Sequence, residues 1–588
     1  MGLVGVDKTG RPIYHVPTNF TSSQVTKTNA FRNNYGFDGA NMEIGLWEAV
    51  DKNTGGNSPL LGHEAFGGRV SYLDTNSTST AASSHATHVA GTLAASPPAG
   101  SGNGDALGMA PAATVSAYSS ANDFAEMALE ADSGMLVSNH SYGVLGGWEY
   151  EDNGACSGFT NRYTWQGGTG EFNANGDDPR FGRYDASCED LDNVCRLAPH
   201  YLPVYAAGNF NNTTPITGLI CDDQVRDGES GTYVDYDPAI HPPANSSQTS
   251  TISWAANAKN VLTVGNLQLD NGTLSAYESS SRGFTDDGRI KPDICGRGTD
   301  VYSTDIPNTN SYGTQTGTSM AAPNVAGSLI LLQQAYEAFN GDGIYMRSAS
   351  LKGLAIHTAE DLGPIGPDRT YGWGVMHTRH AGDIIYEDVG FSLTQTSRIL
   401  EMPDPRGLPY YVYTFNTNGT SDVKVTLCYT DTAGTGTTVH NDTTKKLVND
   451  LDLIVERETP STQFYYPYVM NPGLTTGDND VDNVEQVNIP AAPSGTYRII
   501  VTWEGSLVGQ QPFSLIVSGM AASCNYSLHH GYIYVQPGNY AVENDITSIG
   551  TVSNGDNVNY SAGVNIKLKP GFKSEWGSTF KAELQSCN

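Results

Sequence analysis

The spacing of apolar residues divides the chain into an α/β part and an all-β part. From residue 42 to about residue 385, short apolar runs such as 135–137 and 261–264 alternate with helix-like segments such as 124–129. Strands that alternate with helices predict a mostly parallel sheet with helices on both faces. In such a sheet, functional residues gather beyond the carboxyl ends of the strands.

The pattern becomes purely β near residue 391. Runs at 423–427, 451–455, 484–489 and 497–501 alternate in polarity or are β-branched, and turns rich in Gly, Asn and Pro separate them. This pattern predicts a β-sandwich.

Short strand-like pieces separated by Gly and Asn fill the last part of the chain, which predicts a small β module. We therefore expect four parts: an N-terminal arm (1–40), an α/β domain (41–388), a β-sandwich (389–519) and a C-terminal β module (520–588).

One serine has the setting of a nucleophile. Ser319 follows Gly317-Thr318 and precedes a long run of small and apolar residues that predicts a buried helix. Its hydroxyl would lie at the helix N-terminus, where unpaired backbone N–H groups and the helix dipole favour negative charge. An N-cap serine on a core helix has the same pattern. A serine hydroxyl becomes a good nucleophile only beside a base that a third group orients.

A candidate base lies far upstream, in His85-Ala86-Thr87-His88. Two histidines three residues apart could also be metal ligands. No Glu lies between them and no third Cys or His follows at ligand spacing, which argues against zinc.

These two segments resemble the subtilisin-like serine peptidases. The serine motif of that family matches residues 317–323, and its histidine motif matches residues 85–91, with Ala86 in place of glycine. The resemblance implies that Ser319 is the nucleophile and His85 the general base. It also implies a subtilisin-like parallel sheet with helices on both faces.

The family's oxyanion asparagine matches Asn209, which follows Ala206, Ala207 and Gly208 at the end of an apolar run. All of these motifs stand in the chain order of the family, which makes the resemblance specific.

The acid of the triad departs from the family pattern. Glu48 follows the apolar run 42–47, where the family has aspartate at the end of its first strand. Glutamate can orient the imidazole and stabilise the imidazolium, although it is one methylene longer. Asp51, three residues on, is the rival acid. We favour Glu48, because Asp51 begins a polar stretch that reads as a solvated loop.

The resemblance also places the peptide-binding edge at 139–143, where the substrate backbone would add a strand. A plain sheet edge and turn is the alternative. Small residues would leave room for a large apolar or aromatic substrate side chain, and the insert 148–184 could overhang that pocket. The substrate-binding residues expected here are Ser141, Tyr142, Gly143, Ala206, Ala207 and Gly208.

The C-terminal half carries two further resemblances. Residues 449–453 and 483–485 resemble parts of the jelly-roll domain that follows some subtilisin-like catalytic domains. The acidic turn 478–482 could hold a structural Ca²⁺, or it is a solvated turn in an acidic protein. Residues 568–572 resemble a small β-solenoid module found at the ends of secreted bacterial enzymes.

Charge excludes some partners. Asp and Glu number 62 against 31 Lys and Arg, a formal net charge of -31, which argues against binding nucleic acid or an anionic membrane.

No apolar stretch approaches the 18 residues or so of a membrane span. Residues 1–6 are too short for a signal-peptide core. Secreted subtilisin-like enzymes carry a signal and an inhibitory pro-region, so the resemblance implies either a mature form or a chain expressed without these segments. The expected partner is a protein or peptide substrate, and the expected state is a monomer without a cofactor in the chemistry.

The chain has eight cysteines. Four of them crowd into residues 156–221, where we expect two disulfides. Cys524 and Cys587 bracket the C-terminal module and form a natural third pair. Cys295 and Cys428 lie in apolar surroundings and are expected to be buried thiols.

Three functions fit the sequence. The first is a secreted serine endopeptidase that acts through an acyl-enzyme. The second is a catalytically impaired relative that binds peptides, which only Glu48 suggests. The third is an adhesin whose β domains carry the function.

Overall fold

The computed structural model describes residues 2–6, 12–15, 19–51, 54–74, 81–144, 146–151, 162–165, 178–211, 224–226, 233–235, 250–388, 397–405, 410–470, 473–520, 525–530, 538–548, 551–552, 557–562, 565–568, 572–576 and 578–584.

An eight-stranded sheet forms the centre of the N-terminal part. Strands β12, β9, β6, β3, β5 and β4 run parallel in that order, β14 pairs parallel with β12, and β13 adds an antiparallel edge. The predicted α/β fold with a mostly parallel sheet is confirmed. The strands are β3 (Glu43–Glu48), β4 (Val70–Tyr72), β5 (Thr114–Ser119), β6 (Val137–His140), β9 (Leu202–Ala206), β12 (Leu262–Asp270), β13 (Thr273–Ala276) and β14 (Ile294–Arg297).

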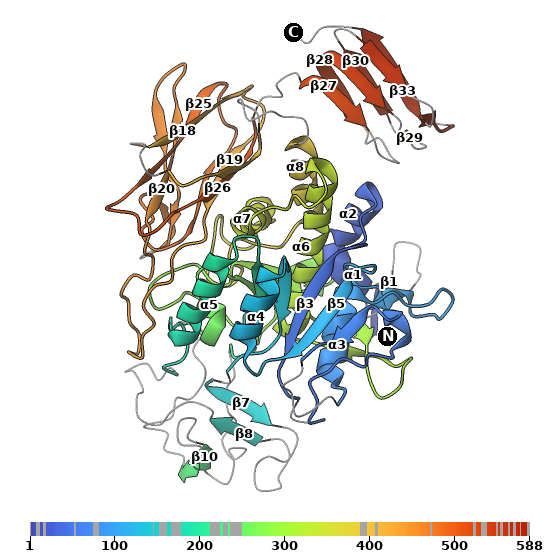
Figure 1. The fold of residues 1–588 in the computed structure, drawn as a ribbon, viewed down its shortest axis with the longest axis vertical. Helices are drawn as coiled ribbons and strands as arrows, with labels where there is room; N and C mark the ends of the chain where they lie inside the picture. Colours follow the sequence, from blue (N-terminus) through green and yellow to red (C-terminus); the bar gives the residue numbers. More distant parts are fainter. Residues whose placement is uncertain are drawn as a thin grey trace.

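Helices cover both faces of this sheet (Figure 1). Because side chains alternate along a strand, Ile44 and Leu46 of β3 join one core with α3 (Ser84–Ala94) and α6 (Thr318–Asn340), whereas Trp47 joins a second core with α4 (Asp123–Asp132) and α5 (Ala186–Leu197). The other helices are α1 (Asn19–Val25), α2 (Thr28–Tyr35), α7 (Ser348–Thr358) and α8 (Thr378–Asp388).

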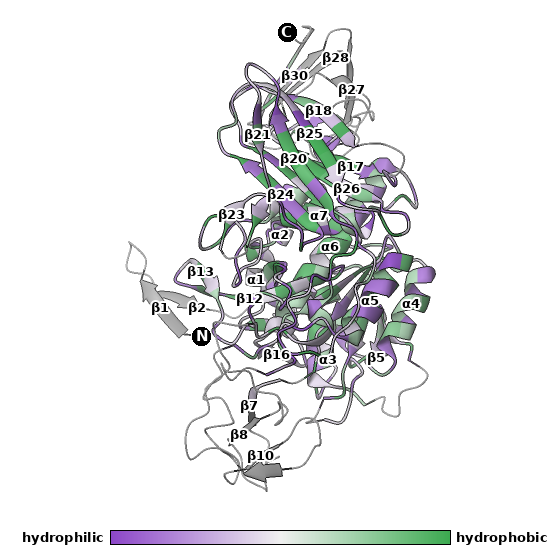
Figure 2. Cartoon of the chain, turned by 90° about the vertical axis from the view of Figure 1, so that its left-hand side faces the viewer, coloured by the Kyte–Doolittle hydropathy of each residue, from purple (hydrophilic) through white to green (hydrophobic). Residues whose placement is uncertain are grey.

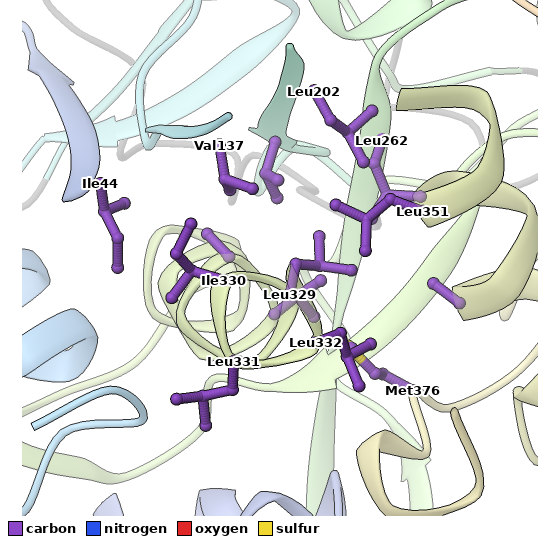
Figure 3. Close-up of a cluster of buried hydrophobic side chains, with 14 of the residues drawn as sticks. Ile44, Val137, Leu202, Leu262, Leu329, Ile330, Leu331, Leu332, Leu351 and Met376 are labelled. Atoms are coloured by element: carbon purple, nitrogen blue, oxygen red, sulfur yellow. The ribbon is translucent and has the colours of Figure 1, made fainter. Parts of the chain in front are cut away.

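Helix α6 lies at the centre of the larger core. Four consecutive residues, Leu329 to Leu332, are fully buried, so the helix is apolar on all sides. Figure 3 shows these side chains among Ile44, Val137, Leu202 and Leu262, which come from four strands of the sheet. This packing fixes the N-terminus of α6, and with it Ser319, at one end of the sheet.

Two four-stranded antiparallel sheets form the predicted β-sandwich. Strands β20 and β25 of this sandwich carry hydrophobic stretches (Figure 2), and their inward residues share one core. The first sheet contains β17 (Ile399–Met402), β26 (Phe513–Ser518), β19 (Val423–Cys428) and β24 (Val484–Ile489); the second contains β18 (Tyr411–Thr417), β25 (Gly495–Trp503), β20 (Leu451–Arg457) and β21 (Gln463–Tyr465).

The sandwich packs on the α/β part through α7, which contacts β19 and β26 (Figure 1). Cys428, Val484 and Ile516 of the sandwich are members of the same hydrophobic core as α6. A buried Lys259 reaches across and donates to Asp431 Oδ2 at 2.5 Å and to the carbonyl oxygen of Thr432 at 2.6 Å. The two parts therefore share both apolar and polar buried contacts.

The C-terminal module contains a parallel sheet in the order β27, β28, β30, β33, with β31 also paired to β28. These strands are β27 (Asn525–His530), β28 (Gly538–Ser548), β30 (Asn557–Ala562), β31 (Asn565–Leu568) and β33 (Thr579–Leu584). Parallel pairing between neighbouring short strands is typical of a solenoid-like module.

The remaining strands form small two-stranded sheets. They are β1 (Gly2–Val6) with β2 (Pro12–His15), β7 (Trp148–Glu151) with β8 (Arg162–Trp165), β10 (Gln224–Arg226) with β11 (Tyr233–Asp235), β15 (Val301–Thr304) with β16 (Tyr312–Gln315), β22 (Tyr468–Val469) with β23 (Thr475–Thr476), and β29 (Thr551–Val552) with β32 (Lys573–Ser574). Three short 3-10 turns, at Glu64–Phe66, Gly104–Ala106 and Trp254–Asn257, complete the described elements.

The cysteines correct one prediction. Cys188 and Cys195 are free and buried on α5, so the two disulfides expected within 156–221 are wrong. Both thiols face the smaller core between α5 and the sheet, where they pack as small apolar groups. Cys295 and Cys428 are buried thiols, as predicted. The pair Cys524 and Cys587 lies outside the described residues. Among the helices that the structure describes, none is long and apolar enough to cross a membrane.

Candidate active site

Glu48 and His85 form a close pair at one end of the sheet. Glu48 is the last residue of β3, and its side chain is only 2% exposed. His85 lies in the first turn of α3 and donates from Nδ1 to Glu48 Oε2 at 2.7 Å. This bond fixes the imidazole tautomer in which Nε2 is free to accept a proton.

Asp51 takes a different place. Ser83 caps helix α3 by accepting from Ala86 N, and its hydroxyl donates to Asp51 Oδ2 at 3.2 Å. Asp51 therefore supports the start of the helix, while Glu48 receives the His85 ring N–H.

The Glu48 carboxylate changes the pKa of the histidine. Burial lowers the pKa of His85, but the negative charge of Glu48 and its hydrogen bond outweigh this effect, with a smaller contribution from Asp51, so the pKa of His85 is raised. Burial also raises the pKa of Glu48, against the opposing effect of His85. The pair is arranged to stabilise a proton on the imidazole.

Ser319 is the second residue of α6, so its backbone N–H is among the first-turn donors that have no acceptor within the helix. Its hydroxyl donates to the carbonyl oxygen of Ser141 at 3.3 Å, and the Ser141 hydroxyl donates to the Ser319 carbonyl oxygen at 2.9 Å. The Ser319 hydroxyl therefore points to the edge that follows β6 in this state, rather than to His85. Hydrogen bonds of catalytic groups are often formed only once substrate is bound.

Asn209 is oriented by residues next to the serine. Its Oδ1 accepts from Thr318 N at 3.0 Å and from Thr318 Oγ1 at 3.1 Å. Thr318 Oγ1 in turn accepts from Gly208 N at 3.2 Å. Because Oδ1 is committed to Thr318, the amide group presents Nδ2 as a donor on the exposed side.

A cavity of about 490 Å³ opens beside Ser319. All six expected substrate-binding residues line it, and none of the described lining residues is Asp, Glu, Lys, Arg or His. The sequence analysis expected Tyr142 here and the insert that begins at Trp148, but it missed the other two aromatic lining residues, Phe210 and Trp254. The lining residues are Ser141, Tyr142, Gly143, Trp148, Ala206, Ala207, Gly208, Asn209, Phe210, Ser253, Trp254, Ala256, Ser279, Thr318 and Ser319.

Four aromatic rings stack across adjacent strands near the strand ends. Tyr118, Trp47, His140 and Tyr205 come from four adjacent strands, with ring centroids 4.5, 5.3 and 4.4 Å apart along the series. Trp47, His140 and Tyr205 each directly precede a predicted site residue in the sequence. Complete burial lowers the pKa of His140 to about 3, so this ring is neutral. The signal that could have found the stack is an aromatic residue one position before each strand-end residue.

Metal binding finds no support. In the described parts of the chain, no three His, Cys, Asp or Glu side chains are grouped so that they could hold a metal ion. In the acidic turn 478–482, Asp480 forms an ion pair with Lys445, and Asp482 Oδ1 accepts from Ile290 N at 2.9 Å. The Ca²⁺ expected at this turn stays a prediction.

Comparison with known proteins gives the family. The model of the subtilase family (Peptidase_S8) matches residues 51–374, which is more than half of the chain. The chain therefore belongs to the subtilase family, the subtilisin-like serine peptidases. The match includes His85, Asn209 and Ser319 and begins just after Glu48.

Individual relatives match over short stretches. The chain is 30% identical over 120 residues to the Neisserial autotransporter lipoprotein NalP of Neisseria meningitidis, which is 20% of this chain and 8% of that protein. It is 53% identical over 58 residues to the C5a peptidase of Streptococcus pyogenes, which is 10% of this chain and 5% of that protein. The matches thus cover less than a tenth of the length of these relatives. A solved protease domain of PatA, a serine-to-alanine mutant, aligns with 60% of this chain and 97% of its own at 17% identity and a TM-score of 0.36.

Proposed function

We propose that this protein is a secreted, monomeric serine endopeptidase that hydrolyses peptide bonds in proteins through an acyl-enzyme intermediate. The observation that carries the proposal is the 2.7 Å bond from His85 Nδ1 to the buried Glu48, in a chain of the subtilase family. Secretion is supported by the strongly acidic composition and by the name of one relative, an autotransporter.

The roles that we propose are those of a serine peptidase triad. His85 Nε2 takes the proton of Ser319 Oγ as that oxygen attacks the substrate carbonyl carbon. Glu48 stabilises the resulting imidazolium. The negative charge that develops on the substrate oxygen is met by Asn209 Nδ2 and the backbone N–H of Ser319. His85 then protonates the leaving amine as the C–N bond breaks. In the second half, His85 takes a proton from water as the water oxygen attacks the acyl carbon, and it returns that proton to Ser319 Oγ as the ester bond breaks.

The cavity beside Ser319 indicates which type of substrate side chain is preferred on the acyl side of the cleaved bond. Its volume of about 490 Å³, its aromatic wall and the lack of charge among its described lining residues favour a large apolar or aromatic side chain. The exposed edge at Ser141 to Gly143 offers backbone groups to an extended substrate.

A fluorophosphonate probe tests the proposal. It should label Ser319. The Ser319→Ala variant should not be labelled, and its kcat on casein should be lower by a factor of about 10⁶. Ser133, at the exposed end of α4, provides the matched control, because Ser133→Ala removes a hydroxyl far from the cavity. Activity near the wild-type level in pure Ser319→Ala protein would end the proposal. An unlabelled protein that still binds peptides would instead be the impaired peptide-binding relative, and one that binds only glycans would be an adhesin.

A further inference from the structure

A chain of hydrogen bonds runs behind the expected substrate edge, residues 141–143. The Tyr201 hydroxyl lies 2.6 Å from Ser138 Oγ, which lies 2.7 Å from His140 Nε2. His140 Nδ1 is 3.0 Å from the Tyr142 hydroxyl, and that hydroxyl donates to Asp123 Oδ2 at 2.7 Å. Because Ser138 and His140 belong to β6 and Asp123 is the first residue of α4, the chain ties the end of the strand to the helix.

The Asp123 carboxylate sets the direction of every hydrogen bond in this chain. An ionised carboxylate only accepts, so the single hydroxyl hydrogen of Tyr142 is directed to Asp123. The Tyr142 oxygen then accepts from His140 Nδ1. Since the buried His140 ring is neutral, its Nε2 accepts from the Ser138 hydroxyl. Bonds that all point one way polarise one another, so the chain holds its members more firmly than separate bonds would.

His140 is also held on both faces of its ring. The Trp47 ring stacks on one side, with centroids 5.3 Å apart and planes 17° apart, and the Tyr205 ring stacks with centroids 4.4 Å apart and planes 8° apart. His140 is fully buried. Contacts on both faces and at both nitrogens leave the ring one orientation.

Ser141 lies between the two anchored residues, His140 and Tyr142. Its hydroxyl donates to the carbonyl oxygen of Ser319 at 2.9 Å, and its own carbonyl oxygen accepts from Ser319 Oγ at 3.3 Å. Gly143, the next residue of the edge, is exposed and has no side chain to anchor it. The position of the edge relative to the nucleophile therefore depends on how firmly His140 and Tyr142 are held.

We infer that Asp123 is a positioning residue, which acts through Tyr142 and His140 to hold the substrate edge beside the nucleophile. The inference rests on the proposed peptidase function. A substrate that pairs with the edge gains backbone contacts with each added residue. Loss of the anchor should therefore weaken long substrates more than short ones, whereas general damage to the enzyme would affect both equally.

Peptides of two lengths test this inference. Succinyl-Phe-p-nitroanilide fills the apolar cavity, and succinyl-Ala-Ala-Ala-Phe-p-nitroanilide adds residues that can pair with the edge. Tyr142→Phe keeps the ring but removes the hydroxyl that Asp123 and His140 share. It should lower kcat/KM on the long peptide about tenfold more than on the short one, as expected for a lost hydrogen bond to a charged group. Equal losses on both peptides, per molecule labelled by a fluorophosphonate, would overturn the inference.

A double variant shows whether Asp123 acts through Tyr142. Asp123→Asn keeps an acceptor for the hydroxyl but removes the charge, so its loss on the long peptide should be smaller than that of Tyr142→Phe. Combining the two should cost little more than Tyr142→Phe alone, because both changes affect the same bond. Losses that simply add would mean that Asp123 acts by another route, which overturns the inference.

Tyr345→Phe is the matched control. It also removes a tyrosine hydroxyl that donates to a carboxylate, Glu337 Oε1, at 2.7 Å, and neither residue lines the apolar cavity. The dependence of kcat/KM on peptide length should stay at the wild-type value in this variant. A change as large as that in Tyr142→Phe would remove the link to the substrate edge.

A binding measurement separates this inference from the proposed function. The Kd of succinyl-Ala-Ala-Ala-Phe-amide is measured by calorimetry on Ser319→Ala protein, with and without Tyr142→Phe, so that turnover plays no part. Binding that is about tenfold weaker with Tyr142→Phe supports the anchored edge even if the wild type cleaves no peptide. Equal Kd values sink it, even if the wild type cleaves both peptides.

Discussion

Glu48 and His85 pair at 2.7 Å although glutamate is one methylene longer than the aspartate of the family pattern. The longer acid fits because Glu48 is the terminal residue of β3, in register with Ser119 of β5, and reaches His85 in the first turn of α3 from there. The strand end, rather than the residue type alone, positions the carboxylate.

This pairing gives the first prediction. Glu48→Gln should lower kcat about 10⁴-fold while the protein stays folded, because the amide can favour the wrong imidazole tautomer and cannot stabilise the imidazolium. Glu48→Asp should keep substantial activity. On an uncharged peptide, Asp51→Asn should lose less than tenfold. Steady-state kinetics on the three variants decide the matter. An inactive Asp51→Asn beside an active Glu48→Gln would reassign the acid and leave the peptidase function standing.

The pH dependence gives the second prediction. The general base must be neutral, and the pKa of His85 is raised by Glu48. Activity should therefore rise with pH through a value above the ordinary histidine pKa of about 6.5. In Glu48→Gln the raising charge is lost, so this acidic limb should move to lower pH. A kcat/KM profile of both proteins measures the shift. A limb at the same pH in both would show that Glu48 does not set the pKa of His85.

The third prediction concerns the oxyanion. Asn209→Ala should lower kcat by about 10²- to 10³-fold with little change in KM, because its Nδ2 would act only on developing charge. Thr318→Val removes one of the two donors that hold Asn209 Oδ1, so it should show a smaller loss of the same kind. Asn340→Ala, at the exposed end of α6, is the matched control. A loss confined to KM would make Asn209 a substrate-positioning residue only.

Much of the site could be predicted because its residues are set by local pattern. Ser319 lies before an apolar helix, His85 begins another, and Glu48 ends an apolar strand. Each of these signals lies within about ten residues of sequence. The same holds for the parallel sheet, which follows from strands that alternate with helices.

The rest depends on contacts between distant residues. Trp148 and Trp254 meet in one cavity wall although 106 positions separate them, and no local pattern brings them together. Cys188 and Cys195 looked like disulfide partners from their crowding, whereas burial in the core beside α5 decides their state. Lys259 reads as a surface residue and is fully buried against the sandwich.

That buried lysine gives the fourth prediction. Lys259 Nζ contacts Asp431, and Asp431 also accepts from Val448 N and Asn449 N at 2.9 Å each. Lys259→Met leaves the buried Asp431 without its counter-charge and should cost about 3–5 kcal/mol of the free energy of unfolding. The double variant Lys259→Met with Asp431→Asn should recover part of this loss. Urea unfolding measures both. A single variant as stable as the wild type would show that the sandwich contact contributes little.

The last prediction concerns a group of carboxyls in the sandwich. Asp452, Asp478 and Glu485 line a cavity of about 460 Å³. Burial, and then the neighbouring Asp450, raises the pKa of Asp452 to about 7. Burial likewise raises the pKa of Asp450 to about 6 and that of Glu485 well above its usual range. At these three carboxyls the folded state therefore binds more protons than the unfolded state between about pH 4, where free carboxyls titrate, and pH 7.

The sign of the effect on stability follows. Because the folded state holds the extra protons at these carboxyls, their contribution to the free energy of unfolding should fall as pH rises through this window. In a chelator, the Tm of Asp452→Asn minus that of the wild type should thus be larger at pH 8 than at pH 5, a comparison in which buried neutral rings such as His140 cancel. If Ca²⁺ binds at the turn 478–482, adding it should raise Tm more at pH 8, where the carboxyls are charged, than at pH 5. Asp478→Asn should weaken that response. A Tm at pH 8 that does not respond to Ca²⁺ would remove calcium from this turn, while the pH trend in chelator would still report the buried carboxyls.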